Sequence, residues 1–470
     1  MIFSSTTRRA FMDSLVSEFD GIDLGDKRLD KRAEKLLAAM SSSPARTIPQ
    51  NFQTWGEIKS CYRFLSNPKI TPLKVFRPHR AQVLKRIQEH PVILCINDTT
   101  SINYTSKVSM EGKGSIGKNI DGLWLHPTIA VTPERVNLGL ININFYTRDI
   151  QEDKIHRNNL PIERKESIRW LSSYQKVDEL ARENSKTNFV YISDREGDII
   201  ELLNEALRSK SENESYADII IRSKHDRLLD EFEEHSNEQL KIKKKLDSMP
   251  ALGEITFYLP TSHDRKARHV TQELKSMTVV FKLHEKSKKQ ASTLSINIVM
   301  AQETLKSAKG EYPLTWILLT TLPVENFADA YKIIEYYLCR WEIEIFFKVL
   351  KSGCKVEEKQ LHSLSNMENL IVFFMIISWR IMYVMMIGRS CPEISCEVVF
   401  EEAEWKSVYK ILNKKAELPL TAPKLQDFII MIASLGGYVG FKNSPSPGVT
   451  VMWRGMLRMH DFALAWEAFG

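Results

Sequence analysis

The sequence predicts an α/β protein with a mixed sheet and helical segments at both ends. Three observations support this prediction. Apolar side chains recur at helical spacing over residues 29–40, before any strand-like run appears. From Val92 onward, short apolar runs typical of strands alternate with a helix expected over 164–181. The final stretch, 366–470, again has a mostly helical pattern.

The size and composition are those of a globular protein. The chain has 470 residues, which at roughly 150 residues per domain corresponds to about three folding units. Hydrophobic residues make up 43% and charged residues 26%, which excludes a disordered chain. We expect a helical domain over 1–90, a mixed domain over 91–365 with a β-rich insertion at about 227–310, and a helical domain over 366–470.

Positive charge is concentrated near the N-terminus. The net charge of the whole chain is +6, and residues 51–90 carry eight basic side chains against two acidic ones. A basic side on a helical module is typical of a surface that binds nucleic acid. An ordinary solvated helix surface is the alternative at this point.

The sequence indicates a protein of the reducing cytosol. Its six cysteines are scattered and form no C-x-x-C pair, so neither a zinc site nor a disulfide framework is indicated. No apolar segment of signal-peptide length follows Arg8 and Arg9, so we expect no secretion. Arg380 interrupts the apolar run Leu370–Ile387, which favours a buried helix over a membrane span. A cytoplasmic location without a membrane partner is therefore expected.

One glycine-rich segment imitates a nucleotide-binding motif. Residues 112–118 have the glycine spacing of a phosphate-binding loop, but such a loop must open a helix, and a strand-like run follows here. We interpret the segment as a hairpin or a substrate-facing loop. Apolar runs over 123–131 and 136–146 flank the turn-forming residues 132–135 and predict another hairpin.

Two aspartates follow buried strands. Asp98 closes the apolar run that begins at Val92, and Asp194 closes the run Phe189–Ile192. If these strands are neighbours in the sheet, both carboxylates lie at the same sheet edge. Each aspartate alone is more often a turn residue or a helix N-cap.

A third acid lies on a long helix expected over 328–352. At about 100° per residue, a narrow face of this helix presents a mixture of aromatic, acidic and basic side chains. An exposed face with ion pairs between successive turns is the alternative. Because the helix also carries many apolar residues, it must be packed, and an acid among cations there favours a functional site. The five side chains are Tyr337, Arg340, Glu344, Lys348 and Lys351.

Asp98, Asp194 and Glu344 together make an oxygen-only ligand set. Three carboxylates without a histidine or cysteine ligand select hard divalent ions, Mg²⁺ or Mn²⁺. A pair of such ions activates a water or a 3′-hydroxyl for in-line attack on a phosphodiester. The basic side chains of the helix face would hold phosphate oxygens. The sequence therefore predicts metal-dependent phosphoryl transfer on nucleic acid.

The expected helix carries a specific signature. Residues 337–351 read Tyr-x-x-Arg-x-x-x-Glu-x-x-x-x-x-x-Lys, and the contexts Asp98-Thr99-Thr100 and Asp194-Arg195-Glu196 accompany it. With the segments 222–225 and 313–316, these motifs resemble those of bacterial insertion-sequence transposases of the DDE class. The similarity is to the branch typified by the transposon-five transposase, and it extends over most of the chain.

The resemblance implies a ribonuclease H-like catalytic core with the β insertion, an N-terminal domain that binds the transposon end, and a C-terminal dimerisation domain. It implies cut-and-paste transposition, in which strand nicking, hairpin formation and strand transfer occur in a synaptic homodimer. The partners are double-stranded DNA of the transposon ends and the target. Asp98, Asp194 and Glu344 would be the catalytic acids and the ligands of two Mg²⁺ or Mn²⁺ ions.

The resemblance also implies roles for other side chains. Trp316 matches the residue that stacks on a flipped base, and Trp341 matches the one that fills the place of that base. A strand tryptophan is otherwise usually a core residue, and this alternative for Trp316 stays open. The expected phosphate-binding residues are Tyr337, Arg340, Lys348, Lys351 and Arg222, and the expected end-binding residues are Lys27, Arg28, Arg32 and Arg63.

Two other functions stay open from the sequence. A catalytically silent derivative, inhibitory or domesticated, would bind DNA through the basic segment without cleaving it. A ribonuclease H-type nuclease would hydrolyse strands without joining them. Because no acid of the triad is missing, an active transposase is favoured.

Overall fold

The computed structural model describes residues 15–148, 161–232, 238–259, 267–283, 292–304, 313–414, 417–440 and 446–469. Contacts along the chain divide it into two units. The first combines residues 1–87, 99–155 and 342–470, and the second combines residues 88–98 and 156–341.

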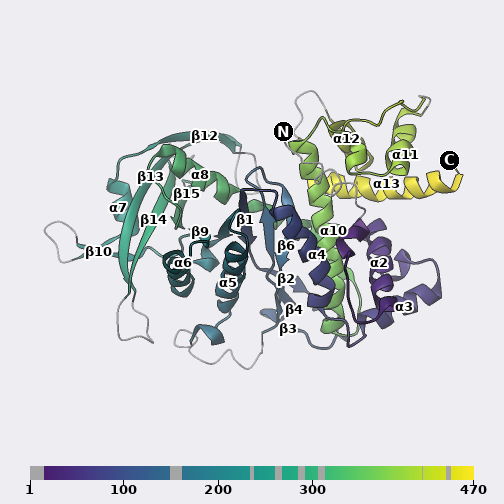
Figure 1. Ribbon diagram of the computed structural model, residues 1–470, viewed down its shortest axis with the longest axis horizontal. Coiled ribbons are helices and arrows are strands. Elements are labelled where there is room, and N and C mark those ends of the chain that lie inside the picture. The colour runs from purple at the N-terminus through teal and green to yellow at the C-terminus, as the bar shows by residue number, and fades with distance from the viewer. Residues whose placement is uncertain are drawn as a thin grey trace. The chain divides into compact units, whose positions relative to one another are not determined.

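The second unit is built on a mixed sheet (Figure 1). β1, β8 and β9 run parallel to one another, and their central residues are buried, which explains their continuous apolar sequences. The other strands join the sheet antiparallel. The strand order is β12 (Gly253–Leu259), β13 (Arg268–Leu283), β14 (Ser292–Glu303), β15 (Thr315–Thr320), β9 (Ala217–Arg222), β8 (Asn188–Ser193) and β1 (Val92–Asn97).

Short elements lie between β9 and β12 in the sequence. β10 (Leu228–Phe232) pairs antiparallel with β11 (Gln239–Lys241), and α7 (Ile242–Ser248) follows. Together with β12, β13 and β14, they occupy the region in which the sequence predicts a β-rich insertion.

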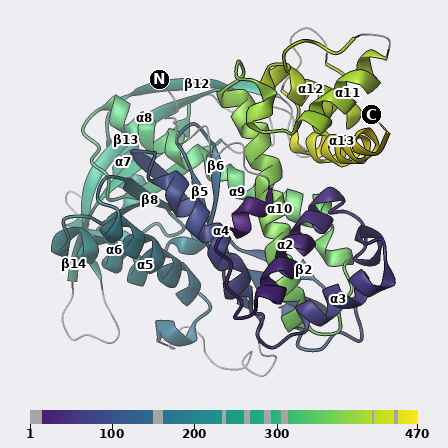
Figure 2. The ribbon, with the colours of Figure 1, turned by 45° about the vertical axis from the view of Figure 1, so that its right-hand side comes forward.

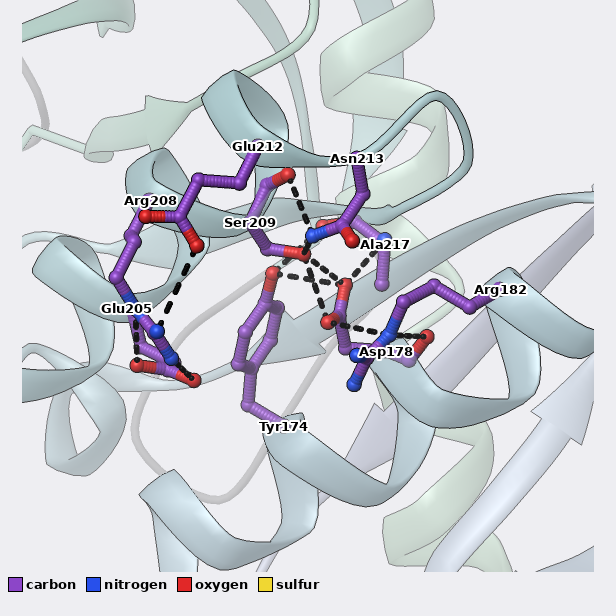
Figure 3. Close-up of polar contacts among 9 residues, drawn as sticks. All are labelled: Tyr174, Asp178, Arg182, Glu205, Arg208, Ser209, Glu212, Asn213 and Ala217. Atoms are coloured by element: carbon purple, nitrogen blue, oxygen red, sulfur yellow. Dashed lines mark hydrogen bonds and ion pairs between the residues drawn. The ribbon is translucent and has the colours of Figure 1, made fainter.

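Helices α5 (Ile168–Glu183) and α6 (Ile200–Glu212) pack against each other and on β8 and β9 (Figure 1). The helix expected over 164–181 thus begins four residues later, after the 3₁₀ turn η5 (Ile162–Arg164). A buried carboxylate joins these elements, because Asp178 accepts hydrogen bonds from Ser209 Oγ at 2.8 and 2.7 Å and from Ala217 N at 2.9 Å (Figure 3). Ala217 begins β9, so this network fixes the N-terminal end of that strand.

The first unit is organised around helix α10 (Leu364–Ser390), which appears in bright green in Figure 2. By length and composition α10 could cross a membrane, but 94% of its most apolar stretch is buried inside the protein. The expectation of a buried helix is therefore confirmed. The helices packed on it include α2 (Lys27–Ser42), α3 (Trp55–Leu65) and α4 (Pro72–Ile87) from the N-terminal region.

A buried ion cluster attaches this N-terminal region to strand β6 (Asn137–Asn142). Glu18 lies 2.6 Å from His79 Nδ1, and Arg86 donates to its two oxygens at 2.7 and 3.1 Å. On the other side of its ring, His79 Nε2 accepts a hydrogen bond from Leu140 N at 3.2 Å. Burial would raise the pKa of Glu18, but Arg86 and His79 together lower it to about 2.

Two hairpins complete the first unit. β5 (Thr128–Val131) and β6 form the predicted hairpin, whereas the single strand expected over 123–131 is wrong. β4 (Ile120–Leu125) ends before His126 and Pro127, because proline has no N–H to donate to a strand ladder. β4 pairs with its neighbours β2 (Thr100–Asn103), β3 (Gly114–Gly117) and β7 (Phe145–Tyr146). The glycine-rich segment therefore forms a hairpin with β4, as expected.

The C-terminal region is helical, as predicted. α11 (Glu402–Asn413), α12 (Leu425–Leu435) and α13 (Val449–Phe469) pack on one another. The terminal helix expected from Met459 begins ten residues earlier. Other short turns among the described residues are η1 (Leu15–Phe19), η2 (Pro49–Asn51), η8 (Val356–Glu358) and η9 (Cys396–Val398).

Candidate active site

Asp98 and Asp194 occupy equivalent positions on neighbouring strands. β1 and β8 are parallel with Ile96 opposite Ile192, so each aspartate lies two residues beyond a paired position. Because the C-terminal ends of parallel strands meet at the same edge of a sheet, both carboxylates lie at that edge. Asp194 also accepts a hydrogen bond from Glu196 N at 2.9 Å. The expected pairing of these two strands is confirmed.

Two more of the predicted residues lie along the same edge. Arg222 ends β9, the neighbour of β8, and Trp316 lies near the start of β15, which is antiparallel to β9. The strand order therefore places Trp316, Arg222, Asp194 and Asp98 in a row. We call this row the active edge. The Trp316 side chain is half-buried and lies at the end of its strand, so it is not a fully buried core residue.

Helix α8 (Phe327–Leu338) and the turn that follows it bring two further side chains to the active edge. The buried ring of Tyr337 meets Trp316 edge to face, with 5.8 Å between ring centroids, and the Tyr337 hydroxyl interacts electrostatically with Arg222. Burial raises the pKa of Tyr337, while Arg340 and Arg222 oppose this change. Arg340 Nη1 lies 3.1 Å from Asp98 Oδ2. An aromatic side chain and two cations thus surround the acids.

The long helix expected over 328–352 is interrupted, which corrects the prediction of one narrow face. α8 ends at Leu338, two turn residues follow, and α9 spans Trp341–Lys348. The chain then continues as a π-helix, η7 (Val349–Gly353), in which Cys354 N bonds to Val349 O. A π turn adds a residue to the helical repeat, so angular positions counted at an α-helical period do not carry through to Lys351.

Of the remaining predicted residues of this segment, Glu344, Lys348 and Lys351 belong to the first unit. Glu344 on α9 is half-buried, and Lys348 in the last turn of α9 is exposed. Burial lowers the pKa of Lys351, although Glu357 opposes this change. Trp341 opens α9 and belongs to the second unit, where its ring is 57% exposed and Arg340 lies 5.9 Å from its centroid.

The predicted end-binding residues lie on α2 and α3 in the first unit. Lys27 and Arg28 are exposed in the first turn of α2, where Asp26 caps the helix and pairs with Arg28 at 2.9 Å. Arg32 lies one turn further on and is half-buried. Arg63 is exposed in the last turn of α3, opposite the buried face of that helix.

Asp198 is not among the site residues predicted from the sequence. This carboxylate lies four residues after Asp194, is fully buried, and pairs with Arg227 at 2.5 Å. An aspartate in a turn after a strand usually caps a helix or a turn, so its type alone carries little signal. Its spacing from Asp194, with Gly197 between them, was the available indication.

The acids suit a hard divalent ion by their chemistry, since Asp98, Asp194 and Glu344 offer oxygen ligands alone. Across the part of the chain that the structure describes, no group of three histidine, cysteine, aspartate or glutamate side chains lies close enough to hold a metal ion. The ion pair with Arg340 neutralises Asp98 in this state.

Three family models match the chain in sequence order. Residues 12–70 match the family described as "Transposase DNA-binding", and residues 163–379 match the "Transposase DDE domain". Residues 376–466 match the "Transposase Tn5 dimerisation domain". Among solved structures, a cryo-EM structure of a piggyBac transposase synaptic complex with hairpin DNA has a TM-score of 0.37 and 10% sequence identity, and the match covers 89% of this chain and 83% of that one.

The sheet with its two strand-end aspartates and the matched DDE domain define a DNA transposase, an enzyme that acts on DNA. The chain belongs to the Tn5-like DDE transposases. It combines a DNA-binding domain with a dimerisation domain, and DDE domains generally depend on divalent metal ions. The predicted fold class, an α/β core between helical regions, is confirmed.

Proposed function

We propose that this transposase performs cut-and-paste transposition at the terminal repeats of an insertion sequence. The reaction comprises nicking of one strand, hairpin formation by the freed 3′-hydroxyl, and strand transfer to a target. The observation that carries the proposal is the active edge, where Asp98 and Asp194 share one end of the sheet with Arg222 and Trp316. Acids beside cations and an aromatic ring suit a DNA strand that is cut and then bent back on itself.

In this proposal Asp98, Asp194 and Glu344 would hold two Mg²⁺ or Mn²⁺ ions. Such ions would supply activation of the attacking water or hydroxyl and stabilisation of the departing oxygen. Glu344 follows Arg340 by four residues, so the helical segment after the turn supplies the third acid. Arg340 releases Asp98 for this role and turns to the phosphate, which carries the negative charge that its guanidinium needs.

The other side chains hold the DNA. Arg222 and Tyr337, which interact electrostatically, bind the phosphate beside the cleaved bond. Trp316 stacks on an extruded base, because its ring lies at the active edge and base stacking on an aromatic ring is worth about 1–3 kcal/mol. Trp341, with its exposed ring, fills the place that the base leaves. Lys348 and Lys351 bind phosphates further along the strand.

The N-terminal domain recognises the transposon end in this proposal. Lys27, Arg28, Arg32 and Arg63 supply positive charge from α2 and α3, within the segment that matches a DNA-binding family. The active assembly is a synaptic homodimer joined through the C-terminal domain, residues 366–470. We further propose that the protein acts on DNA in the cytoplasm.

A nicking assay on duplex DNA carrying the element's terminal repeat tests the proposal. Wild-type protein should nick the end and then form a hairpin when Mg²⁺ is added. Asp98→Asn and Glu344→Gln should each lower the nicking rate by about 10²–10³ or more while they still bind the end. Glu335→Gln is the matched control, because it removes the same charge from an exposed position on α8.

The same assay separates the two alternatives. Specific binding without cleavage in either Mg²⁺ or Mn²⁺ would indicate a silent DNA-binding derivative. Nicking without hairpin formation or strand transfer would indicate a ribonuclease H-type nuclease. Full activity in both Asp98→Asn and Glu344→Gln would remove the acidic triad from the mechanism.

A further inference from the structure

One buried carboxylate joins the two loops that leave the active edge. Asp198 lies four residues after Asp194, and none of its side chain is exposed. Its Oδ2 accepts hydrogen bonds from Lys224 N at 2.6 Å, His225 N at 3.2 Å and Arg227 Nη1 at 2.9 Å. Arg227 Nη2 also lies 2.5 Å from Oδ1. The carboxylate therefore holds the loop after β9 both by its backbone and by an ion pair.

The turn that carries Asp198 has little freedom. Between Asp194 and Asp198 the chain makes a 3₁₀ turn, η6 (Arg195–Gly197), and Gly197 N bonds to Asp194 O at 3.2 Å. A Cβ added at Gly197 would lie 2.1 Å from Ser193 Oγ, so this turn packs directly on the end of β8. The positions of Asp194 and Asp198 are coupled as a result.

The loop held by Asp198 is continuous with Arg222. The first backbone amide that Asp198 holds is two residues past Arg222. Between them, Ser223 N donates to Ile317 O of β15 at 2.8 Å. The loop therefore determines where the Arg222 guanidinium lies relative to the acid at the end of β8.

We propose that Asp198 is a positioning residue for strand cleavage, which fixes the Arg222 loop against the turn that carries Asp194. The inference rests on the proposed function, because it needs Arg222 to bind a phosphate. Asp198 touches no reacting atom and acts through the two loops that it joins. Burying a carboxylate costs free energy unless hydrogen-bond donors surround it. Asp198 therefore stabilises the one arrangement of the two loops that brings all of its donors into place.

Asp178 provides a matched control. It is another buried aspartate of the second unit, and it accepts a backbone hydrogen bond from Ala217, at the opposite end of β9 (Figure 3). Asp198→Asn keeps the shape of the side chain and one acceptor oxygen but removes the charge that pairs with Arg227. Asp178→Asn makes the same chemical change at the other end of the strand. Both are made in the full-length protein and assayed below their melting temperatures.

We expect Asp198→Asn to lower the nicking rate at saturating terminal-repeat DNA by about 10- to 100-fold. This range is typical of residues that hold the side chains of a site in position without contacting the reacting atoms. The Kd for that DNA should not change, because the end-binding residues lie on α2 and α3. Asp178→Asn should lower Tm without changing the nicking rate. Hydrogen exchange at the amides of Lys224 and His225 should accelerate in Asp198→Asn alone.

Equal rate losses in the two variants, or an unchanged rate in Asp198→Asn, would overturn the proposal. If Asp198→Asn does not fold, Arg227→Gln replaces it, since this variant removes the ion pair and keeps the carboxylate. Arg227→Gln should also slow nicking at unchanged Kd. An unchanged nicking rate in this variant would overturn the proposal. Failure of wild-type protein to nick DNA would remove the proposed function and this role with it. Faster exchange at the two amides would then still show that Asp198 holds the loop.

Discussion

Arg340 Nη1 lies 3.1 Å from Asp98 Oδ2, although 242 residues separate them in the sequence. Both side chains are largely buried, with 14% and 19% of their surfaces exposed. In the proposed mechanism Asp98 binds a metal ion, and Arg340 would compete with that ion because both are attracted to the same carboxylate. We therefore expect the pair to affect both DNA cleavage and metal affinity.

Replacing Arg340 should separate these two consequences. Arg340→Gln should lower the nicking rate by about 10²–10³, because the variant lacks the donor that we propose for the reacting phosphate. The Mn²⁺ concentration for half-maximal nicking should fall, because no cation then competes for Asp98. Nicking rates over a Mn²⁺ series measure both quantities. Arg340→Lys is the control, since lysine retains the positive charge without the planar, forked guanidinium. A Mn²⁺ concentration for half-maximal nicking that rises in Arg340→Gln would contradict the expectation.

Trp316 should matter more for hairpin formation than for nicking. Trp316→Ala removes the ring that meets Tyr337 and that we propose stacks on the extruded base. At about 1–3 kcal/mol per stacked base, hairpin formation should slow by roughly 5- to 100-fold. First-strand nicking needs no extruded base and should change little. Product analysis on denaturing gels distinguishes nicking from hairpin formation. As the control, Trp316→Phe should retain most hairpin formation. Equal loss of both steps in Trp316→Ala would indicate a folding defect.

Arg63 should contribute to end binding mainly through charge. It is exposed on α3 within the DNA-binding segment. Arg63→Ala should weaken binding of the terminal repeat and reduce the slope of log K against log salt by about 1. Arg208→Ala removes the same charge from α6 in the second unit and serves as the control. Identical salt slopes for both variants and wild type would exclude Arg63 from the DNA contact.

The first unit should lose stability in acid through Glu18 and His79. Because Arg86 and His79 lower the pKa of Glu18 from 4.5 to about 2, the stabilisation is present above pH 4.5 and is lost as pH falls toward 2. The loss amounts to on the order of 3 kcal/mol. Burial also lowers the pKa of His79 below 6.5, although Glu18 opposes this change, so protonation of the unfolded state adds to the loss below that pH.

Urea unfolding between about pH 7 and 3 measures this dependence. Trp379, whose ring centroid lies 4.9 Å from that of His79, provides a fluorescence signal within the first unit. Glu18→Gln should be less stable at neutral pH, because Arg86 loses its partner, and its stability should vary less with pH. A wild-type free energy of unfolding that stays constant down to pH 3 would contradict the assignment.

Much of the candidate site could be predicted from residue type and spacing. Strand-like runs that end in Asp98 and Asp194 predicted the shared sheet edge, because the direction of parallel strands follows from the α/β order. The interruption of the helix at Cys339 and Arg340 could not be predicted, since neither residue type breaks helices. The π-helix at 349–353 likewise depends on packing rather than on propensity.

By itself the sequence determined the α/β class, the helical ends and the set of candidate side chains for the chemistry, because hydrophobic period and residue type are local properties. Tertiary structure alone decided that Arg340 pairs with Asp98, that the Tyr337 ring meets Trp316, and that Asp198 holds the loop after β9. These contacts join residues far apart in the chain. Their geometry depends on strand order and on which charges are buried together, and no local pattern in the sequence encodes either.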